Sequence, residues 1–295
     1  MLLIYIYIKI LTKRRKKLTN PPEQRSLTVV YNNYQISEQP YSIMNKYLKT
    51  TLSAGLIAGL ALAGVSQVHA QTVFTDADGA NSLLGNSGNW DNGVPTGGQQ
   101  GTVNINADWA SSESYDGFDI LHTGGTISPG GFETGGWSIG DGSTYLMDGA
   151  TAAINGTRGV TVGVGSSFTV DDGLANLTAN NRDTSVDQGS FTINGGTVQI
   201  GRALKVFGTG SSFTITGGTL DVSNAIRDNG FGTGNAVLNF NGGTTTADSF
   251  DFGQSGESVN FGGTTAGSLT LSSLGTIAPL NWLSGSQMAL TITGA

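Results

Sequence analysis

Apolar and polar residues alternate along the second half of the chain in short segments that recur about every 22 residues. Residues 190–198 read Ser-Phe-Thr-Ile-Asn-Gly-Gly-Thr-Val and residues 212–220 read Ser-Phe-Thr-Ile-Thr-Gly-Gly-Thr-Leu, which match at seven of nine positions. Such alternation predicts strands with one buried face, and the Gly-Gly pairs predict sharp corners that need positive φ angles. The fixed period indicates an array of similar units.

Seven units align on an aromatic or aliphatic residue that stands a few positions before a glycine turn. Their spacings run from 21 to 25 residues, and the aligned residues are Ile120, Tyr145, Phe168, Phe191, Phe213, Leu238 and Val259. A second alternating segment precedes most of them, at 137–140, 160–163, 204–207 and 250–253. Each unit therefore contains three short predicted strands.

Units of this length cannot bury a hydrophobic face alone, but stacked units can. We therefore predict an all-β fold, a right-handed parallel β-helix (β-solenoid) with about seven coils of 20–25 residues over 118–275. Equivalent residues would lie ~4.8 Å apart and form an internal ladder. An antiparallel sandwich also has regularly spaced strands, but only a solenoid gives residues at a fixed offset equivalent surroundings.

The segments on either side of the array differ from it. Residues 71–117 lack the repeat and contain Trp90 and Trp109. We interpret them as an N-terminal cap, because an open first coil would expose sheet edges that template aggregation. Residues 276–295 are predicted to form terminal strands that either a partner or further sequence beyond Ala295 covers.

Charge and glycine content both change near residue 70. Residues 1–70 hold nine of the 14 Lys+Arg but only two of the 21 Asp+Glu, so five basic and 19 acidic residues remain, a net charge of −14. Residues 44–70 contain two lysines, an apolar run at 52–65 and small residues at Val68 and Ala70. This order predicts a secretory signal peptide at 44–70, since the apolar run is shorter than the ~20 residues that span a bilayer.

A signal peptide normally begins a chain, so residues 1–43 are interpreted as a translated or disordered leader upstream of a true start at Met44. A membrane anchor or a basic nucleic-acid arm is the alternative. The exported part, 71–295, has no cysteine, which is typical of a bacterial surface protein rather than a disulfide-stapled domain. Its acidic balance argues against binding nucleic acid, and no membrane span is expected in it.

Residues 88–95, Gly-Asn-Trp-Asp-Asn-Gly-Val-Pro, and the following Thr-Val-Asn-Ile at 102–105 carry a family resemblance. They are similar to the opening of bacterial autotransporter-associated β-strand repeat proteins and of exosortase-sorted (PEP-CTERM-like) surface proteins, and the coils resemble passenger segments of that group. The resemblance covers most of 86–265 and implies architecture more than activity. Such proteins end in an outer-membrane barrel or a sorting tail, and neither pattern occurs up to Ala295.

Several segments resemble parts of metal-binding or phosphate-binding motifs. Residues 76–79, Asp-Ala-Asp-Gly, resemble the start of a calcium loop, but the glycine comes too early and no later glutamate completes an EF-hand. Residues 135–141 fail the calcium-binding nonapeptide pattern. The glycine-rich stretches lack the Gly-Lys-Ser/Thr ending of a phosphate loop. We therefore expect no metal, no cofactor and no cofactor-binding residues.

Parallel β-helices also include polysaccharide lyases and hydrolases, which place clustered carboxylates on one face of the coils. The residues best suited to that role fall in two groups: Asp171, Asp172, Arg182 and Asp183 first, and Arg202, Arg227 and Asp228 second. His122 is the single histidine of the exported part and is expected to be an exposed side chain at the end of a strand. With so few basic groups, we assign no catalytic residue.

The sequence therefore predicts an exported structural or adhesive protein without catalytic activity. We expect an acidic, glycine-rich β-solenoid, secreted to the exterior or outer surface of a Gram-negative-type bacterium. Its partners would be glycans, extracellular matrix or other surface proteins. The alternative is an extracellular polysaccharide lyase or hydrolase on the same scaffold, and its site would lie where the repeat fails, near 171–187.

Overall fold

The described part of the chain is a stack of parallel strands. The computed structural model describes residues 71–77, 84–95, 99–109, 114–115, 119–129, 137–140, 142–155, 159–178, 182–228 and 235–293. All of them belong to one compact unit, Gln67–Ala295, and they contain strands and a single 3-10 turn, η1 (Ser87–Asn89). The predicted leader (1–43) and signal peptide (44–70) lie outside the described residues.

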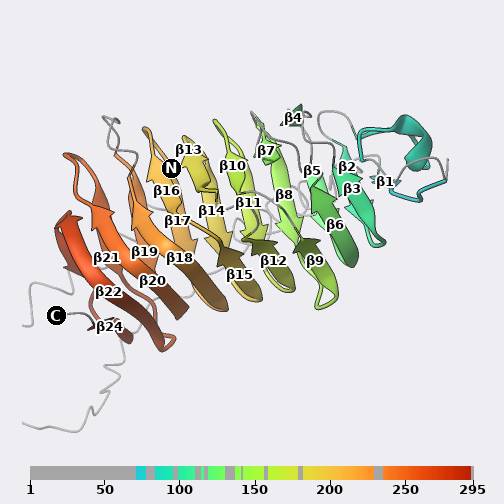
Figure 1. Cartoon of the computed structure of the whole chain (residues 1–295). Coiled ribbons are helices and arrows are strands. Elements are labelled where there is room, and N and C mark those ends of the chain that lie inside the picture. Colours follow the sequence, from blue (N-terminus) through green and yellow to red (C-terminus); the bar gives the residue numbers. More distant parts are fainter. Residues whose placement is uncertain are drawn as a thin grey trace, which may run out of the picture. The chain divides into compact units, whose positions relative to one another are not determined.

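One face of the stack is a ten-stranded sheet in which every strand pairs in parallel with the corresponding strand of the next coil (Figure 1). In order, its strands are β1 (Gln71–Val73), β2 (Gln100–Val103), β5 (Asp119–His122), β8 (Thr144–Met147), β11 (Ser167–Val170), β14 (Ser190–Ile193), β17 (Ser212–Ile215), β19 (Val237–Phe240), β21 (Ser258–Phe261) and β23 (Leu280–Trp282). The predicted all-β solenoid is thereby confirmed.

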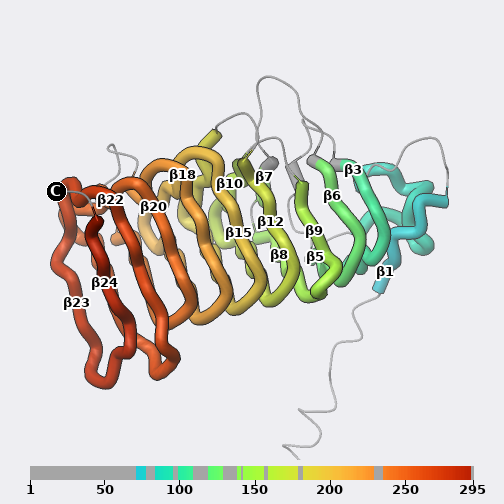
Figure 2. The backbone as a smooth tube through the Cα atoms, turned by 60° about the horizontal axis from the view of Figure 1, so that its bottom comes forward, coloured from blue at the N-terminus to red at the C-terminus, as the bar shows by residue number. Residues whose placement is uncertain are grey.

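A fourteen-stranded sheet forms the other two faces. One face holds β3 (Ala107–Trp109), β6 (Gly125–Pro129), β9 (Ala152–Asn155), β12 (Leu174–Leu177) and β15 (Thr197–Ile200), and the other holds β4 (Ser114–Tyr115), β7 (Trp137–Ile139), β10 (Val160–Val162), β13 (Thr184–Asp187) and β16 (Leu204–Phe207). The longer β18 (Thr219–Arg227) pairs with both β15 and β16, so it bends across the corner between the faces. The strands β20 (Gly243–Phe252), β22 (Gly267–Ile277) and β24 (Met288–Ile292) stack on it in turn (Figure 2).

The predicted ladder is correct to the residue. The seven aligned positions from Ile120 to Val259 pair one with the next along the ten-stranded sheet, without a slip of register. Ile120 is 6% exposed and the other six are at most 1% exposed. The 21- to 25-residue period therefore measures one turn of the solenoid.

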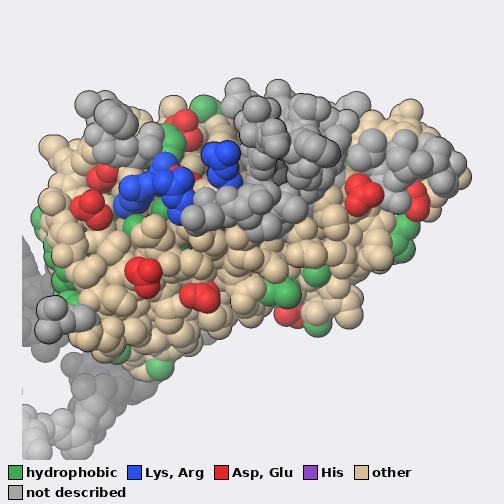
Figure 3. Space-filling view, in the orientation of Figure 1, with side chains coloured by type: hydrophobic (Ala, Val, Ile, Leu, Met, Phe, Trp, Pro, Cys, Tyr) green, Lys and Arg blue, Asp and Glu red, His purple; other side chains and the backbone are tan. Residues whose placement is uncertain are grey.

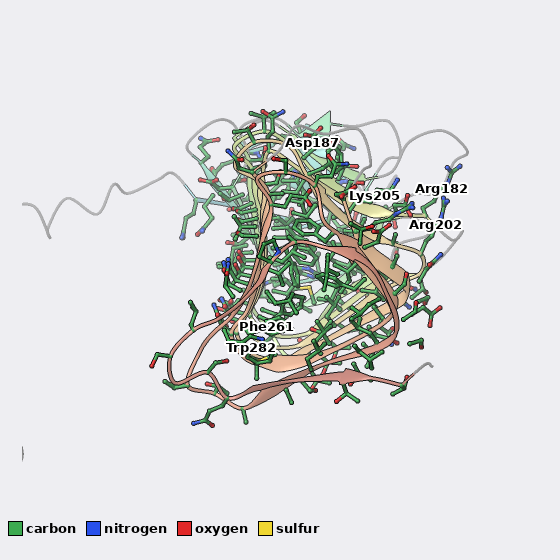
Figure 4. The ribbon with its side chains drawn as sticks, turned by 90° about the vertical axis from the view of Figure 1, so that its left-hand side faces the viewer. Arg182, Asp187, Arg202, Lys205, Phe261 and Trp282 are labelled. Atoms are coloured by element: carbon green, nitrogen blue, oxygen red, sulfur yellow. The ribbon has the colours of Figure 1, made fainter. Side chains whose placement is uncertain are left out.

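A second inward row runs beside the first, two residues further along each strand. It contains Val103, His122, Met147, Val170, Ile193, Ile215, Phe240 and Phe261. Trp282 pairs with Phe261 at the end of this row and is 50% exposed. The aromatic rings change from the first row to the second after Phe213, whose ring centroid lies 6.1 Å from that of Phe240. The contacts then continue through Phe261 to Trp282, with the last pair stacked at 4.4 Å (Figure 4). Aromatic packing thus continues although Leu238 interrupts the first row.

The two glycines of each corner serve different needs, as Gly195 and Gly196 show. A Cβ on Gly195 would lie 2.1 Å from the carbonyl oxygen of Asp171 in the preceding coil, so no side chain fits there. Gly196 has φ +64°, which side chains disfavour. The first glycine therefore permits close approach between coils, and the second makes the turn.

Residues 84–95 cover the interior of the first coils. Trp90 is 5% exposed, packs edge-on against Phe74 and lies where a Cβ on Gly101 would be 2.9 Å from its ring. Gly101 occupies the ladder position next to Ile120, so the Trp90 indole replaces a side chain there.

The first strand is also held to this segment by a hydrogen bond. Asp91 accepts a 2.7 Å hydrogen bond from the Val73 amide, which holds the Asp91 pKa below its ordinary value. Because β1 and β2 already pair with the coils, the sheet begins before residue 118, where the sequence placed the first repeat.

Replacing a central ring tests whether the ladder stabilises the stack. Phe213 is fully buried between Phe191 and Phe240. We expect Phe213→Ala to lower the free energy of unfolding by about 3–5 kcal/mol, because it removes apolar contact and leaves a cavity. Phe213→Leu, the control, keeps most of the volume and should cost less than about 1.5 kcal/mol. Denaturant titration of both variants measures the difference, and equal costs would contradict a packed ladder.

Candidate functional site

Four of the five basic residues in 71–295 lie together on one side of the stack. Arg182 precedes β13, Arg202 precedes β16, Lys205 lies within β16, and Arg227 ends β18. Their side chains gather in one region of the surface (Figure 3), and Arg182, Arg202 and Lys205 lie on the same side of the ribbon (Figure 4). The fifth, Arg158, lies outside the described residues.

The carboxylate of Asp183 joins three of these cations. Lys205 Nζ lies 2.6 Å from Oδ2, Arg202 Nε lies 3.4 Å from Oδ1, and Arg227 Nη2 lies 3.9 Å from Oδ2. The Ala203 amide donates a further 3.3 Å hydrogen bond to Oδ1. The side chain of Asp183 is 14% exposed, whereas those of Arg202 and Arg227 are 43% and 38% exposed. We call Arg182, Asp183, Arg202, Lys205 and Arg227 the basic cluster.

The coil register creates a charge problem that Asp183 partly relieves. Lys205 and Arg227 are direct partners in the parallel pairing of β16 and β18, so two positive side chains occupy adjacent outward positions. Like charges placed directly opposite each other destabilise a sheet. One carboxylate among four cations leaves the basic cluster with an excess of three positive charges. Arg227 Nε is shielded from solvent and has no hydrogen-bond partner among the described residues.

The structure unites part of the two residue groups that the sequence suggested for catalysis and separates the rest. Arg182 and Asp183 meet Arg202 and Arg227 in the basic cluster. Asp171 and Asp172 lie instead in the turn between β11 and β12, at a different corner of the coil. Asp171 Oδ1 accepts 2.8 Å from Asn194 Nδ2, and Asp172 Oδ1 accepts 2.7 Å from the Gly173 amide. Both act there as turn residues.

Beyond the basic cluster the charge changes sign. Asp251 pairs in register with Arg227, and Asp228 Oδ1 accepts 3.3 Å from Gln254 Nε2. Glu257, which the sequence analysis did not single out, is 8% exposed, and its Oε2 accepts 2.7 Å from the Gln254 amide. Burial raises the pKa of Glu257, Asp228 and Asp251 raise it further, and the Gln254 amide opposes them. The hydrogen bond closes the 254–257 turn, so Glu257 has a structural role here.

Sequence reasoning also missed Lys205 as a site residue. The signal was present, because Lys205 and Arg227 are 22 residues apart, the same offset as the ladder residues Phe191 and Phe213. Both stand at outward positions of alternating segments. Applied to charged residues, the repeat would have predicted that they are neighbours.

The prediction that His122 is exposed was wrong. His122 is fully buried at the end of β5, in the inward row between Val103 and Met147. Its Nε2 lies 3.1 Å from the Gly125 carbonyl oxygen, and its Nδ1 lies 2.8 Å from Tyr145 Oη. A carbonyl only accepts, so the neutral ring donates from Nε2 and accepts the Tyr145 hydroxyl at Nδ1. Burial lowers the pKa of His122 and raises that of Tyr145.

Comparison with known proteins adds nothing to this geometry. No protein-family model, no curated protein and no solved structure matches the chain. Within the described ranges, no three His, Cys, Asp or Glu side chains come together in a way that could hold a metal ion. None of the described segments is a helix with the length and apolar character needed to cross a bilayer.

The buried His122 should make stability depend on pH. Its pKa in the folded state lies below the value of about 6.5 in the unfolded chain, so the unfolded chain binds more protons as pH falls through 6.5. We expect the parent to lose up to about 1.4 kcal/mol per pH unit from this group below pH 6.5, and to lose nothing from it above. Denaturant titrations of the parent and His122→Gln from pH 7.5 to 5.5 measure the contribution. A stability difference between the two that stays constant with pH would contradict it.

Removing the Asp183 charge should weaken this corner. Asp183→Asn leaves Lys205 and Arg227 adjacent without the carboxylate between them, and we expect a loss of about 1–2 kcal/mol, since the cations are partly screened by solvent. High salt should recover part of the loss by screening the repulsion. Asp221→Asn on β18, an exposed aspartate outside the basic cluster, is the control. Equal thermal midpoints for Asp183→Asn and that control would refute the role of Asp183.

Proposed function

We propose that this chain is an exported structural or adhesive protein of the bacterial cell surface, without catalytic activity. The observation that carries the proposal is a regular polar outer surface on a hydrogen-bonded scaffold. On the ten-stranded sheet, Asn281 Nδ2 donates 3.0 Å to Asn260, Asn260 Nδ2 donates 2.9 Å to Asn239, and Asn239 Nδ2 donates 3.2 Å to Thr214. Such ladders tie successive coils together outside as the rings do inside.

The same sheet offers many neutral hydrogen-bonding groups at outward positions. Ser167, Ser190 and Ser212 form one row, and Thr169, Thr192 and Thr214 form the row beside it. Adjacent coils repeat these hydroxyl groups every ~4.8 Å. A surface of this kind suits glycans, matrix polymers or other surface proteins, because it presents the same groups many times along one axis.

Two further considerations favour this function over a polysaccharide lyase or hydrolase. Asp171 and Asp172 are engaged in turn hydrogen bonds, and they lie at another corner than Asp183. Asp183 itself is occupied by cations and the Ala203 amide. The family resemblance of the repeats supports surface location, and the signal-peptide pattern at 44–70 supports export.

Expression of the full coding sequence in a Gram-negative host tests the proposal. We expect the exported product to begin at Gln71 by N-terminal sequencing and to be accessible to antibody on intact cells, because cleavage after Ala70 fits the signal peptide. Leu60→Arg, which breaks the apolar run, is the control and should retain the product inside the cell.

Two results would count against the proposal. An exported product that retains residues 1–43 would overturn the assigned start and signal peptide. Release of unsaturated or reducing sugar ends from a polysaccharide panel would favour the enzyme, especially if Asp172→Ala abolished that release.

A further inference from the structure

We propose that the basic cluster is a binding site for the carboxylate or sulfate groups of an anionic polysaccharide. The proposal names a partner for the adhesive surface and so rests on the proposed function. It starts from an imbalance of charge. Residues 71–295 carry a net charge of −14, yet four of their five basic residues occupy one region of the surface. In an acidic protein, such a concentration of cations favours the binding of an anionic ligand.

The concentration of positive charge is local, because acidic residues border it. Among the residues that the structure describes, Asp183 is the carboxylate that lies within ion-pair distance of these cations. Asp187 on β13, Asp228 directly after β18 and Asp251 beside Arg227 border the cluster, and with Asp183 they equal the four cations in number. The positive charge is therefore concentrated along the row of cations and is bordered by acids. An added anion would be attracted to Lys205 and Arg227 together, and it would relieve the repulsion that their pairing creates.

The cations retain hydrogen-bonding capacity toward solvent. Arg202 contacts Asp183 through Nε at 3.4 Å, and its side chain is 43% exposed. Arg227 reaches Asp183 only at 3.9 Å, and its side chain is 38% exposed. A guanidinium can donate two parallel hydrogen bonds to one carboxylate or sulfate. Asp183 thus holds the cations in position while their outer donors stay accessible.

The surroundings of the basic cluster fit a sugar polymer. The pairing of successive strands places Ser138, Thr161, Ser185, Lys205 and Arg227 in one outward row parallel to the axis of the stack. The row therefore joins hydroxyl-bearing residues to cationic ones. Along such a row, an extended acidic polysaccharide would place its hydroxyl groups on the Ser/Thr part and its acid groups on the cations.

The same charge distribution disfavours a nucleic acid or an anionic membrane. Both present dense negative charge over distances longer than the ~10 Å Debye length, and both are attracted by broad basic surfaces. Here Asp251 follows Arg227 directly in register, and acidic residues dominate the rest of 71–295. A narrow row of cations between neutral and acidic neighbours is better matched by a thin polymer whose negative charges are widely spaced than by a densely charged surface.

Binding of the full chain to three immobilised probes tests the inference: polygalacturonate for carboxylate groups, dextran sulfate for sulfate groups, and dextran as the neutral reference. The cluster variant is Arg202→Gln with Lys205→Gln. Its control is Gln287→Glu with Asn104→Asp, which makes the net charge more negative by the same two units at exposed positions elsewhere. All three proteins keep the nine basic residues of 1–70, so differences between them report the cluster alone.

We expect the parent to bind at least one of the two anionic polymers more tightly than dextran, and the binding to weaken as salt increases. The cluster variant should lose at least tenfold in affinity, while the control stays within about threefold of the parent. Thermal midpoints and circular dichroism confirm that each variant is folded. Arg202→Lys with Lys205→Arg keeps the charge and provides a second folded comparison, which should retain most of the binding.

Three results would overturn the inference. The cluster variant could bind as tightly as the parent, the control could weaken as much as the cluster variant, or duplex DNA or phosphatidylglycerol vesicles could be bound more tightly than either polysaccharide. None of these would affect the cleavage site or surface exposure of the protein. Failure of the inference is therefore distinguishable from failure of the proposed function.

Discussion

The parallel pairing of each coil with the next is the constraint on which the rest of this structure depends. Side chains alternate between the two faces of a strand, so a slip of one residue would move the whole ladder from Ile120 to Val259 out of the interior. The observed register has no slip along the ten-stranded sheet. The Gly-Gly corners permit this close stacking, because a side chain at Gly195 would collide with the coil beneath it.

The same register determines the outer surface. Residues one coil apart become neighbours whether or not their side chains attract each other, which is why Lys205 and Arg227 are adjacent and why Asn239 and Asn260 share a hydrogen bond. Favourable pairs stabilise the stack, and unfavourable pairs require compensation from a nearby group. Asp183 gives that compensation. It lies in the corner before β13, where side chains do not have to alternate between the inside and the outside as they do in a strand.

The sequence predicted the fold well because the repeat reports the interior directly. It predicted the site less well, since it treated neighbours in sequence, such as Asp172 and Asp183, as neighbours in space, whereas strand β12 lies between them and places them at different corners of the coil. His122 was misjudged for a related reason: a turn follows it, but the alternation Asp-Ile-Leu-His in β5 already points its side chain inward. The shift of the aromatic rings at Phe213 and Phe240 depends on packing between rows, which a single aligned column does not contain.

The residues that stabilise the stack and the residues of the proposed binding site are therefore different residues of the same coils. From Val103 to Phe261 the side chains of the inward rows are at most 6% exposed, and any change there alters the packing of two neighbouring coils. Arg202 and Arg227 stand outside that packing, with about two fifths of each side chain exposed. Their replacement by neutral residues leaves the ladder intact, whereas replacement of the largely buried Asp183 disturbs the cations and the corner together. A solenoid of this kind can thus vary its outward residues from coil to coil while the packing of its interior stays the same.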